Sequence, residues 1–304
     1  MRKTFIETLI KQARQNDKIW LLVADVGYNL VEPFQKEFSD RFVNVGIAEQ
    51  NMIGVAVGLA LSGKTVFCYS LANFPTLRCL EQIRNDACYH NADVKIVSGG
   101  VGLTYGSLGF THHATEDMAV MRALPNIIVE SPCDPVETEL AVEFMCDSPK
   151  PYYLRLSKTG DEIIHKSKPE FRIGKAIRLG QGKDVAFISC GSIMSEVLKA
   201  VKLLKADGIE SSVWSMHTVK PIDVLAVVEA VKCKVIVTVE EHNILGGLGS
   251  AVAEILSHTG LECKHRIIGI PDCFSKEVGS QQYLRERYCL TAEWITKIAK
   301  EIVK

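Results

Sequence analysis

Glu49 is a carboxylate that could exchange a proton with a ligand. It lies at the start of residues 48–61, a stretch that reads as a helix apolar nearly all round. A carboxylate in the first turn of a helix is favoured by the helix dipole. Glu49 is therefore either an N-terminal capping residue or, if its carboxyl is buried, a group that can share a proton with a ligand nitrogen.

Phe74 is an aromatic side chain at a position where ligands commonly bind. It precedes Pro75 at a predicted helix start and follows the strand-like run KTVFCYS at 64–70. Ligands of open α/β sheets bind beyond the carboxyl ends of the strands. Phe74 is thus either a core aromatic or a ring that stacks on a ligand.

A glycine-rich loop, GGVGLTYGSLGFTHHATED at 99–117, carries the adjacent residues His112 and His113. Two neighbouring histidines do not share a helix face, and no third ligand accompanies them, so the pattern predicts no metal site. Imidazoles at the end of such a loop suit proton transfer or the binding of sugar hydroxyls.

Phosphate-binding motifs are absent, since neither GxxxxGK(S/T) nor GxGxxG after a strand occurs. The nearest candidate is GGLGS at 246–250, which opens a helix. Its amides could face an anion, or its glycines could simply allow a tight strand-to-helix turn. The sequence therefore predicts no ATP or dinucleotide site.

These segments must be positioned by buried strands that alternate with helices. Strand-like runs occur at 19–25, 64–70, 93–100, 126–132 and 151–157, and a second series at 184–190, 210–216, 234–240 and 264–270. Runs that are apolar on both faces are typical of parallel sheets with crossover helices. We expect an α/β fold of two doubly wound, mostly parallel sheets: a first domain over 1–157, a polar linker over 158–175 and a second domain over 176–304.

Composition excludes several classes of protein. The 304 residues include 35 basic and 36 acidic side chains without a basic run, so neither nucleic acid nor an anionic membrane surface is an expected partner. No apolar run approaches the roughly 18 to 20 residues that span a bilayer, and the opening segment MRKTFIETLIKQARQN lacks a signal-peptide pattern. We expect a cytoplasmic protein whose ten scattered cysteines, none in a CxxC pair, stay reduced.

Small residues on the helix of 48–61 predict a close contact with another backbone. Gly54 and Gly58 are four residues apart and have alanines beside them. The contact could be with a helix of the same chain or lie across a subunit interface.

Taken together, these segments resemble the C-terminal half of the transketolases, and more closely the separate small subunit of enzymes split into two chains. The resemblance is carried by GIAEQNMIGVAVGLAL, FPTLRCLEQIRN, GSLGFTHHATEDMAVMRALPNIIVESPCDPVETE and TVEEHNILGGLGSAV, and it extends over essentially the full chain. It implies a thiamine diphosphate enzyme whose cofactor lies between subunits. The family's GDG motif, which holds the diphosphate and Mg²⁺, is missing. GDE at 160–162 has no suitable partner, so no metal site is expected here.

A partner is therefore implied: an N-terminal transketolase subunit that carries the GDG motif and binds most of the Mg²⁺, in a heterotetramer with two copies of each chain. This chain would supply the pyrimidine side of the cofactor site.

The resemblance also assigns roles to individual residues. Glu49 matches the glutamate that hydrogen-bonds the aminopyrimidine ring, which favours the tautomer whose amino group accepts the thiazolium proton. Phe74 matches the ring that stacks on the pyrimidine, Asp25 an acidic position near the thiazolium, and His112 the histidine that faces the substrate. Arg78 matches a recurrent arginine without an assigned role.

Substrate-facing positions depart from the family pattern. Leu108 stands where an acidic residue selects the acceptor's 2-hydroxyl, and His113 where glutamine is usual. The histidine, serine and arginine that hold sugar phosphates are matched by Gly100, Tyr28 and Lys158, of which Lys158 alone keeps a positive charge. We therefore expect transfer of a two-carbon ketol unit to a sugar other than the common pentose phosphates, either unphosphorylated, modified or otherwise anionic.

Three alternatives remain open. The same pyrimidine domain occurs in deoxyxylulose phosphate synthase, normally one fused chain, and in the beta subunits of 2-oxoacid dehydrogenases. A non-catalytic interaction subunit is a third possibility, and the presence of Glu49 and His112 argues against it.

Overall fold

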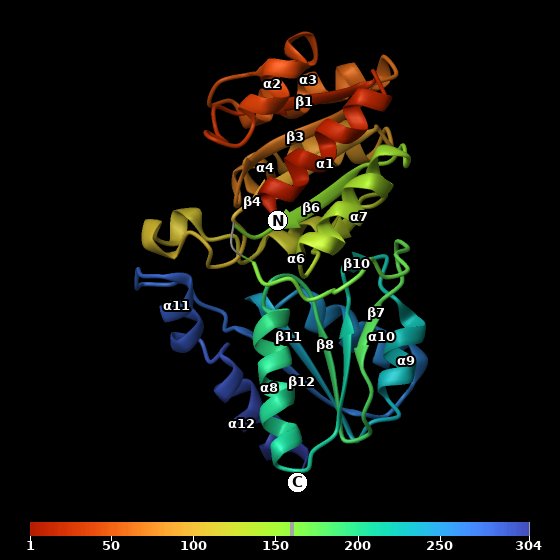
Figure 1. The fold of residues 1–304 in the computed structure, drawn as a ribbon, viewed down its shortest axis with the longest axis vertical. Coiled ribbons are helices and arrows are strands. Elements are labelled where there is room, and N and C mark those ends of the chain that lie inside the picture. The colour runs from red at the N-terminus through yellow and green to blue at the C-terminus, as the bar shows by residue number, and fades with distance from the viewer. Residues whose placement is uncertain (159–160, 304) are drawn as a thin grey trace.

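Two α/β halves make up the computed structural model, which describes residues 1–158 and 161–303 (Figure 1). The first half is built on a seven-stranded sheet in the order β10-β5-β6-β4-β3-β1-β2, and the second on a five-stranded sheet in the order β12-β11-β8-β9-β7. All neighbouring strands are parallel except β10 with β5 and β7 with β9. The predicted fold class is confirmed.

The strands of the first sheet are β1 (Ile19–Val23), β2 (Phe42–Asn44), β3 (Thr65–Leu71), β4 (Val94–Gly99), β5 (Ile128–Glu130), β6 (Tyr152–Leu156) and β10 (Thr218–Lys220). Helices α1 (Arg2–Gln15), α2 (Glu32–Glu37) and α7 (Pro135–Cys146) pack on one face of the sheet, and α3 (Glu49–Leu61), α6 (Asp117–Ala123) and the turn η2 (Ile83–Cys88) on the other. Shorter pieces lie in the connections: α4 (Phe74–Leu77), α5 (Leu80–Gln82), η1 (Ser39–Arg41), η3 (Gly106–Leu108) and η4 (Phe110–His112).

The strands of the second sheet are β7 (Ile177–Gly180), β8 (Val185–Ser189), β9 (Ser211–Ser215), β11 (Val235–Asn243) and β12 (Lys264–Ile270). Helices α8 (Met194–Ala206), α11 (Gln281–Arg287) and α12 (Ala292–Val303) cover one face, and α9 (Val224–Ala230) and α10 (Leu248–Thr259) the other. The nine predicted strand runs all contain a strand. The strands β2, β7 and β10 carried no recognisable signal, because they are three or four residues long.

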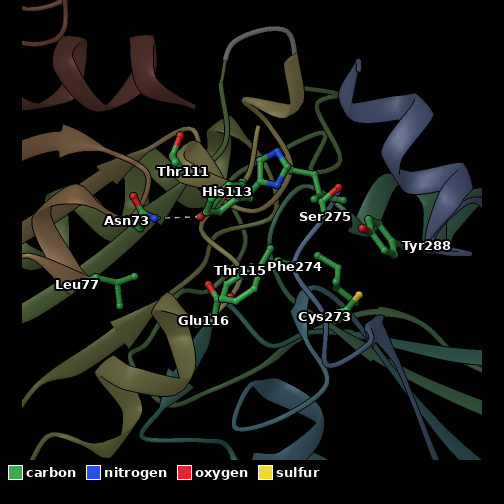
Figure 2. Close-up of a pocket in the computed structure, with 13 residues that line it drawn as sticks. Asn73, Leu77, Thr111, His113, Thr115, Glu116, Cys273, Phe274, Ser275 and Tyr288 are labelled. Atoms are coloured by element: carbon green, nitrogen blue, oxygen red, sulfur yellow. Dashed lines mark hydrogen bonds between the residues drawn. The ribbon is translucent and has the colours of Figure 1, made fainter. Parts of the chain in front are cut away.

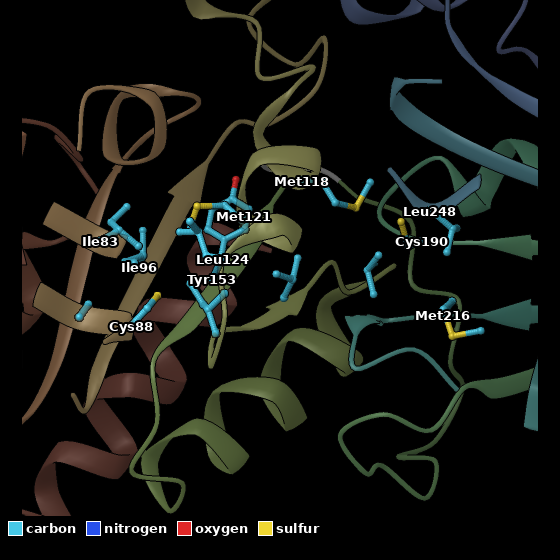
Figure 3. Close-up of a cluster of buried hydrophobic side chains, with 14 of the residues drawn as sticks. Ile83, Cys88, Ile96, Met118, Met121, Leu124, Tyr153, Cys190, Met216 and Leu248 are labelled. Carbon is cyan, nitrogen blue, oxygen red and sulfur yellow. The ribbon is translucent and has the colours of Figure 1, made fainter. Parts of the chain in front are cut away.

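The two halves share one hydrophobic core and one sheet. Figure 3 shows buried side chains that continue from Met118 and Met121 of the first half to Cys190, Met216 and Leu248 of the second. In addition, β10 leaves the second half and pairs antiparallel with β5. The halves are thus joined by packing and by backbone hydrogen bonds.

The predicted linker is anchored rather than free over its described residues, 158 and 161–175. It contains no helix or strand there, but His165 is buried and Phe171 stacks on His217 with ring centroids 4.1 Å apart. Residues 159 and 160, and with them part of the GDE string, lie outside the described residues. The domain boundaries stay a prediction.

No helix among the described residues is long and apolar enough to cross a membrane. The ten cysteines, all of which lie in the described part of the chain, are unpaired, and Cys273 is the exposed one. Burial raises the pKa of several of these thiols, for example that of Cys88 to about 11.

Candidate functional site

Parallel pairing brings the three chemistry-bearing segments to one edge of the first sheet. Strands β4, β3, β1 and β2 are neighbours in that order, so their carboxyl ends lie along the same edge. Glu49 follows β2, Phe74 follows β3, and the glycine-rich loop follows β4. The fold therefore gathers residues that are up to 63 positions apart in the sequence, from Glu49 to His112.

Glu49 is the first residue of α3 and is 4% exposed. Nη1 of Arg78 donates to both of its carboxylate oxygens, at 3.1 Å each. The two side chains border an open recess on the surface, together with Ile47, Ala48, Gln50 and Asn51. A nearly buried carboxylate beside an open recess can contact a ligand without first becoming exposed.

The small-residue face of α3 makes no close contact within the described part of the chain. Around Gly54 and Gly58 no atom lies within 4 Å of where a Cβ would stand. The backbone contact predicted for this face is therefore not intramolecular, which leaves a subunit interface as the remaining interpretation.

Phe74 joins Glu49 to the glycine-rich loop. The guanidinium carbon of Arg78 lies 3.9 Å from the centroid of the Phe74 ring, and the ring of His112 meets Phe74 edge-on at 5.2 Å. Glu49, Phe74 and His112, which the sequence predicts as site residues, are thus connected through direct contacts. Their roles stay predictions.

Tyr105 is a further residue of this group that sequence reasoning missed. Its ring lies 6.5 Å from that of His112. Gly100, with a φ of +80°, leaves the space for it, because a Cβ at Gly100 would clash with Cε2 of Tyr105. A tyrosine between glycines in a loop after a strand was the available signal. Thus the position where the family pattern has a histidine is occupied by a tyrosine ring from elsewhere in the loop.

Two cationic side chains flank Tyr105. Nη1 of Arg2 donates to the Tyr105 hydroxyl at 2.9 Å, and Nζ of Lys158 lies 5.7 Å from the ring centroid. Lys158 is the residue predicted to contact substrate, and Arg2 was not predicted. This end of the group is therefore positively charged.

His113 points away from His112. It is 3% exposed, its Nε2 has no partner among the described residues, and burial lowers the pKa of its imidazole. As Figure 2 shows, it lines a separate cavity of about 360 Å³, whose apolar lining includes Phe110 and Phe274. The amide of Asn73 donates to the backbone oxygen of His113 at 3.2 Å. The structure therefore does not bring His113 together with His112, Phe74 and Glu49.

Asp25 and Leu108 also lie apart from the contacts around Phe74. Asp25 follows β1 with a φ of +51° and accepts hydrogen bonds from Tyr28 at 3.2 Å and Asn44 at 3.1 Å. This acidic partner raises the pKa of the Tyr28 hydroxyl. Leu108 is half exposed on η3. Asp25 lies on the same sheet edge as the other residues, because β1 is parallel to β2 and β3.

A buried arginine fixes the end of the glycine-rich loop. Arg155 of β6 donates from Nε to Asp117 at 2.8 Å and from Nη2 to the backbone oxygens of Ala114 and Glu241, at 2.9 Å each. The Glu241 carboxylate in turn accepts from the amide of Leu103 at 2.8 Å. Strand β11 of the second half therefore helps to hold the loop that carries His112.

The GGLGS turn holds an internal carboxylate. Glu240 of β11 accepts from the amides of Leu248 at 2.7 Å and Gly249 at 2.8 Å. Burial raises the pKa of Glu240 to about 7, although both amides act to lower it. The hypothesis that these amides bind an external anion is therefore wrong, and the tight-turn interpretation holds.

One group of possible metal ligands, Cys133, Glu137 and His165, is buried at the junction of the halves. Glu137 accepts from Nε2 of His165 at 2.9 Å and from the amide of Cys133 at 2.7 Å. This pairing raises the pKa of His165 against the effect of its burial. The hydrogen bonds account for the cluster among the described residues. No sequence pattern announced it, because His165 is 28 residues from Glu137.

Comparison with known proteins identifies both halves. The family model for the transketolase pyrimidine binding domain matches residues 1–160, and that for the transketolase C-terminal domain matches residues 174–295. One of the two subunits of an apulose-4-phosphate transketolase, from Phocaeicola vulgatus, is 38% identical, over 100% of this chain and 97% of its own length. The 6-deoxy-6-sulfo-D-fructose transketolase subunit SqwH of a Clostridium species is 37% identical, over 100% of this chain and 94% of its own length.

A solved structure has the same fold. It is a split gene transketolase in the form of an inactive beta4 tetramer, with a TM-score of 0.89 and 36% identity, covering 99% of this chain and 97% of the solved one.

Proposed function

Because the chain belongs to the transketolase family, we propose that it is the pyrimidine-side subunit of a two-chain transketolase that depends on thiamine diphosphate. The enzyme would transfer a two-carbon ketol unit from a ketose to an aldose. The observation that carries this proposal is the nearly buried Glu49 carboxylate, which faces an open recess next to the ring of Phe74.

The residues present fit the pyrimidine half of the cofactor. Glu49 offers a carboxylate that can hold a proton on a ring nitrogen, and Phe74 offers an aromatic face that orients a planar ring and excludes water. His112, whose ring meets the edge of Phe74, would hold or move a proton at a substrate hydroxyl. Thiamine diphosphate, when bound, supplies the carbon nucleophile of the reaction.

A partner subunit would hold the diphosphate and Mg²⁺. The sequence contains no GDG motif. The similarity to an inactive assembly made of beta chains supports the idea that such a chain needs a second kind of subunit for activity. We propose a heterotetramer in which residues 1–157 form the cofactor-binding domain and 176–304 the C-terminal domain, joined by the linker 158–175.

The substrate would be an anionic sugar. Arg2 and Lys158 place two positive charges around Tyr105, beside His112, whereas Leu108 offers no acid to select a hydroxyl. A guanidinium can pair with phosphate or sulfonate oxygens through two hydrogen bonds. Two relatives are named for a sugar phosphate and a sulfosugar, which is in keeping with this charge.

The test is reconstitution with the N-terminal transketolase subunit encoded by the same organism. We expect the single chain to be inactive and the mixture to transfer ketol units in the presence of thiamine diphosphate and Mg²⁺. A panel of phosphorylated, sulfonated and neutral sugars should favour anionic ones. Turnover by the single chain would contradict the partner requirement, and preference for neutral sugars would contradict the substrate class.

Glu49→Gln in the reconstituted enzyme should leave the assembly folded but lower kcat by several orders of magnitude, because proton transfer at the cofactor is lost. Near-normal turnover of this variant at saturating thiamine diphosphate would sink the assignment of Glu49. Glu81→Gln, an exposed carboxylate on α5, is the matched control and should keep normal turnover.

A further inference from the structure

Arg78 occupies the place that the proposed function gives to the pyrimidine ring. Its guanidinium covers the Phe74 ring at 3.9 Å from the centroid, and its Nη1 donates to both oxygens of Glu49 at 3.1 Å. We propose that Arg78 is a built-in stand-in for the cofactor, which pairs with Glu49 in the unliganded subunit and swings away when thiamine diphosphate binds. This inference rests on the proposed function.

The chemistry of the two groups is alike. A guanidinium and a protonated aminopyrimidine are both planar and cationic, both stack on an aromatic face, and both donate in-plane N–H groups to a carboxylate. Arg78 uses the carboxylate and the aromatic ring that the pyrimidine would use. The two groups therefore compete for one position.

Burial of Glu49 explains why a stand-in is needed. The Glu49 side chain is 3% exposed, and a buried carboxylate without a partner is strongly destabilising. Arg78 compensates this charge from a position where its own side chain is 46% exposed. The subunit can thus keep its catalytic carboxylate buried before any cofactor arrives.

The surroundings let Arg78 leave without disturbing the backbone. Nε2 of Gln50 donates to the backbone oxygen of Arg78 at 2.9 Å, which ties this residue's main chain to α3. The guanidinium has no hydrogen-bond partner other than Glu49 within residues 1–158 and 161–303. Release of the side chain therefore costs the contacts with Glu49 and Phe74 alone.

Calorimetric titration of the assembled two-subunit enzyme with thiamine diphosphate and Mg²⁺ tests the proposal. Arg78→Met removes the competitor and should tighten binding by about three- to thirtyfold, the range set by one ion pair and one cation–π contact. Arg78→Lys, which keeps the charge but loses the planar group, should fall between the two. Arg84→Met removes an exposed arginine on η2 that contacts Asn85, and should leave the affinity unchanged.

A second measurement guards against a misfolded variant. In the single chain without cofactor, Arg78→Met should lower the thermal midpoint because Glu49 is left unpaired. The double variant Glu49→Gln with Arg78→Met should recover most of that loss. Failure to recover would overturn the proposed pairing.

The outcomes separate the two proposals. If the wild-type complex binds thiamine diphosphate and Arg78→Met binds it equally or more weakly, the stand-in is refuted while the proposed function stands. An unchanged cofactor affinity with a large loss of kcat would instead make Arg78 a positioning residue of the loaded enzyme. If neither wild type nor Arg78→Met binds the cofactor, both proposals fail.

Discussion

Arg155→Met should destabilise the chain far more than loss of a surface arginine would. The Arg155 side chain is 3% exposed, and its partner Asp117 is fully buried. Methionine fills similar space without a donor, so it leaves the Asp117 carboxylate and the backbone oxygens of Ala114 and Glu241 short of a hydrogen bond. Removing one partner of a buried ion pair costs about 3 to 5 kcal/mol.

Urea unfolding followed by circular dichroism measures this loss. With an m-value of about 3 kcal/mol/M, the midpoint should fall by roughly 1 to 2 M. Arg172→Met is the matched control, because Arg172 pairs with Glu170 at 2.7 Å on the surface, where an ion pair contributes about 0 to 1 kcal/mol. If the two variants unfold at the same urea concentration, the reasoning about the junction is wrong.

Three shorter predictions concern other sites. Gly100→Ala puts a methyl group against the Tyr105 ring at a φ of +80°, so it should displace the ring and lower kcat/KM for anionic sugars at least tenfold (~1.4 kcal/mol) while cofactor affinity persists; unchanged kcat/KM would exclude a role for the ring. Burial lowers the pKa of His242 to about 4, so the unfolded chain binds the proton more tightly, and stability present above pH ~6.5 should decline as the pH falls towards 4, by up to about 3 kcal/mol; an equally steep decline in His242→Asn would contradict this. Cys273 should react first with a thiol reagent in the folded chain, with peptide mass mapping as the readout, because it is exposed; earlier labelling of Cys79, which is buried, would contradict the burial pattern.

Strand periodicity in the sequence was sufficient to predict the order of the main sheet elements. Runs such as KTVFCYS are apolar on both faces, and only a parallel sheet covered by helices buries both. The position of Glu49 at the first turn of α3 followed from the same pattern. By contrast, β10 consists of three residues whose pairing with β5 depends on a contact between halves, and no local pattern encodes it.

Side-chain partners were beyond the sequence for a related reason. The contact of Arg78 with Glu49 joins residues 29 positions apart, and that of Arg2 with Tyr105 joins residues 103 apart. Long flexible side chains can reach many partners, so residue type and spacing do not select one. The GGLGS turn failed as a phosphate-site prediction because Glu240, the acceptor for its amides, lies six residues before the turn on a buried strand.

Pairing of β10 with β5 has a consequence for synthesis on the ribosome. Strand β6 ends at Leu156, whereas the strand that closes the outer edge of β5 is complete only at Lys220. At about 5 to 20 residues per second, the nascent first sheet waits for several seconds with the edge of β5 unpaired. An unpaired edge is a template for association with other chains. Slow translation between these two strands, or an early stop within the second half, would therefore leave an aggregation-prone nascent chain, and a chaperone that covers strand edges would act during this interval.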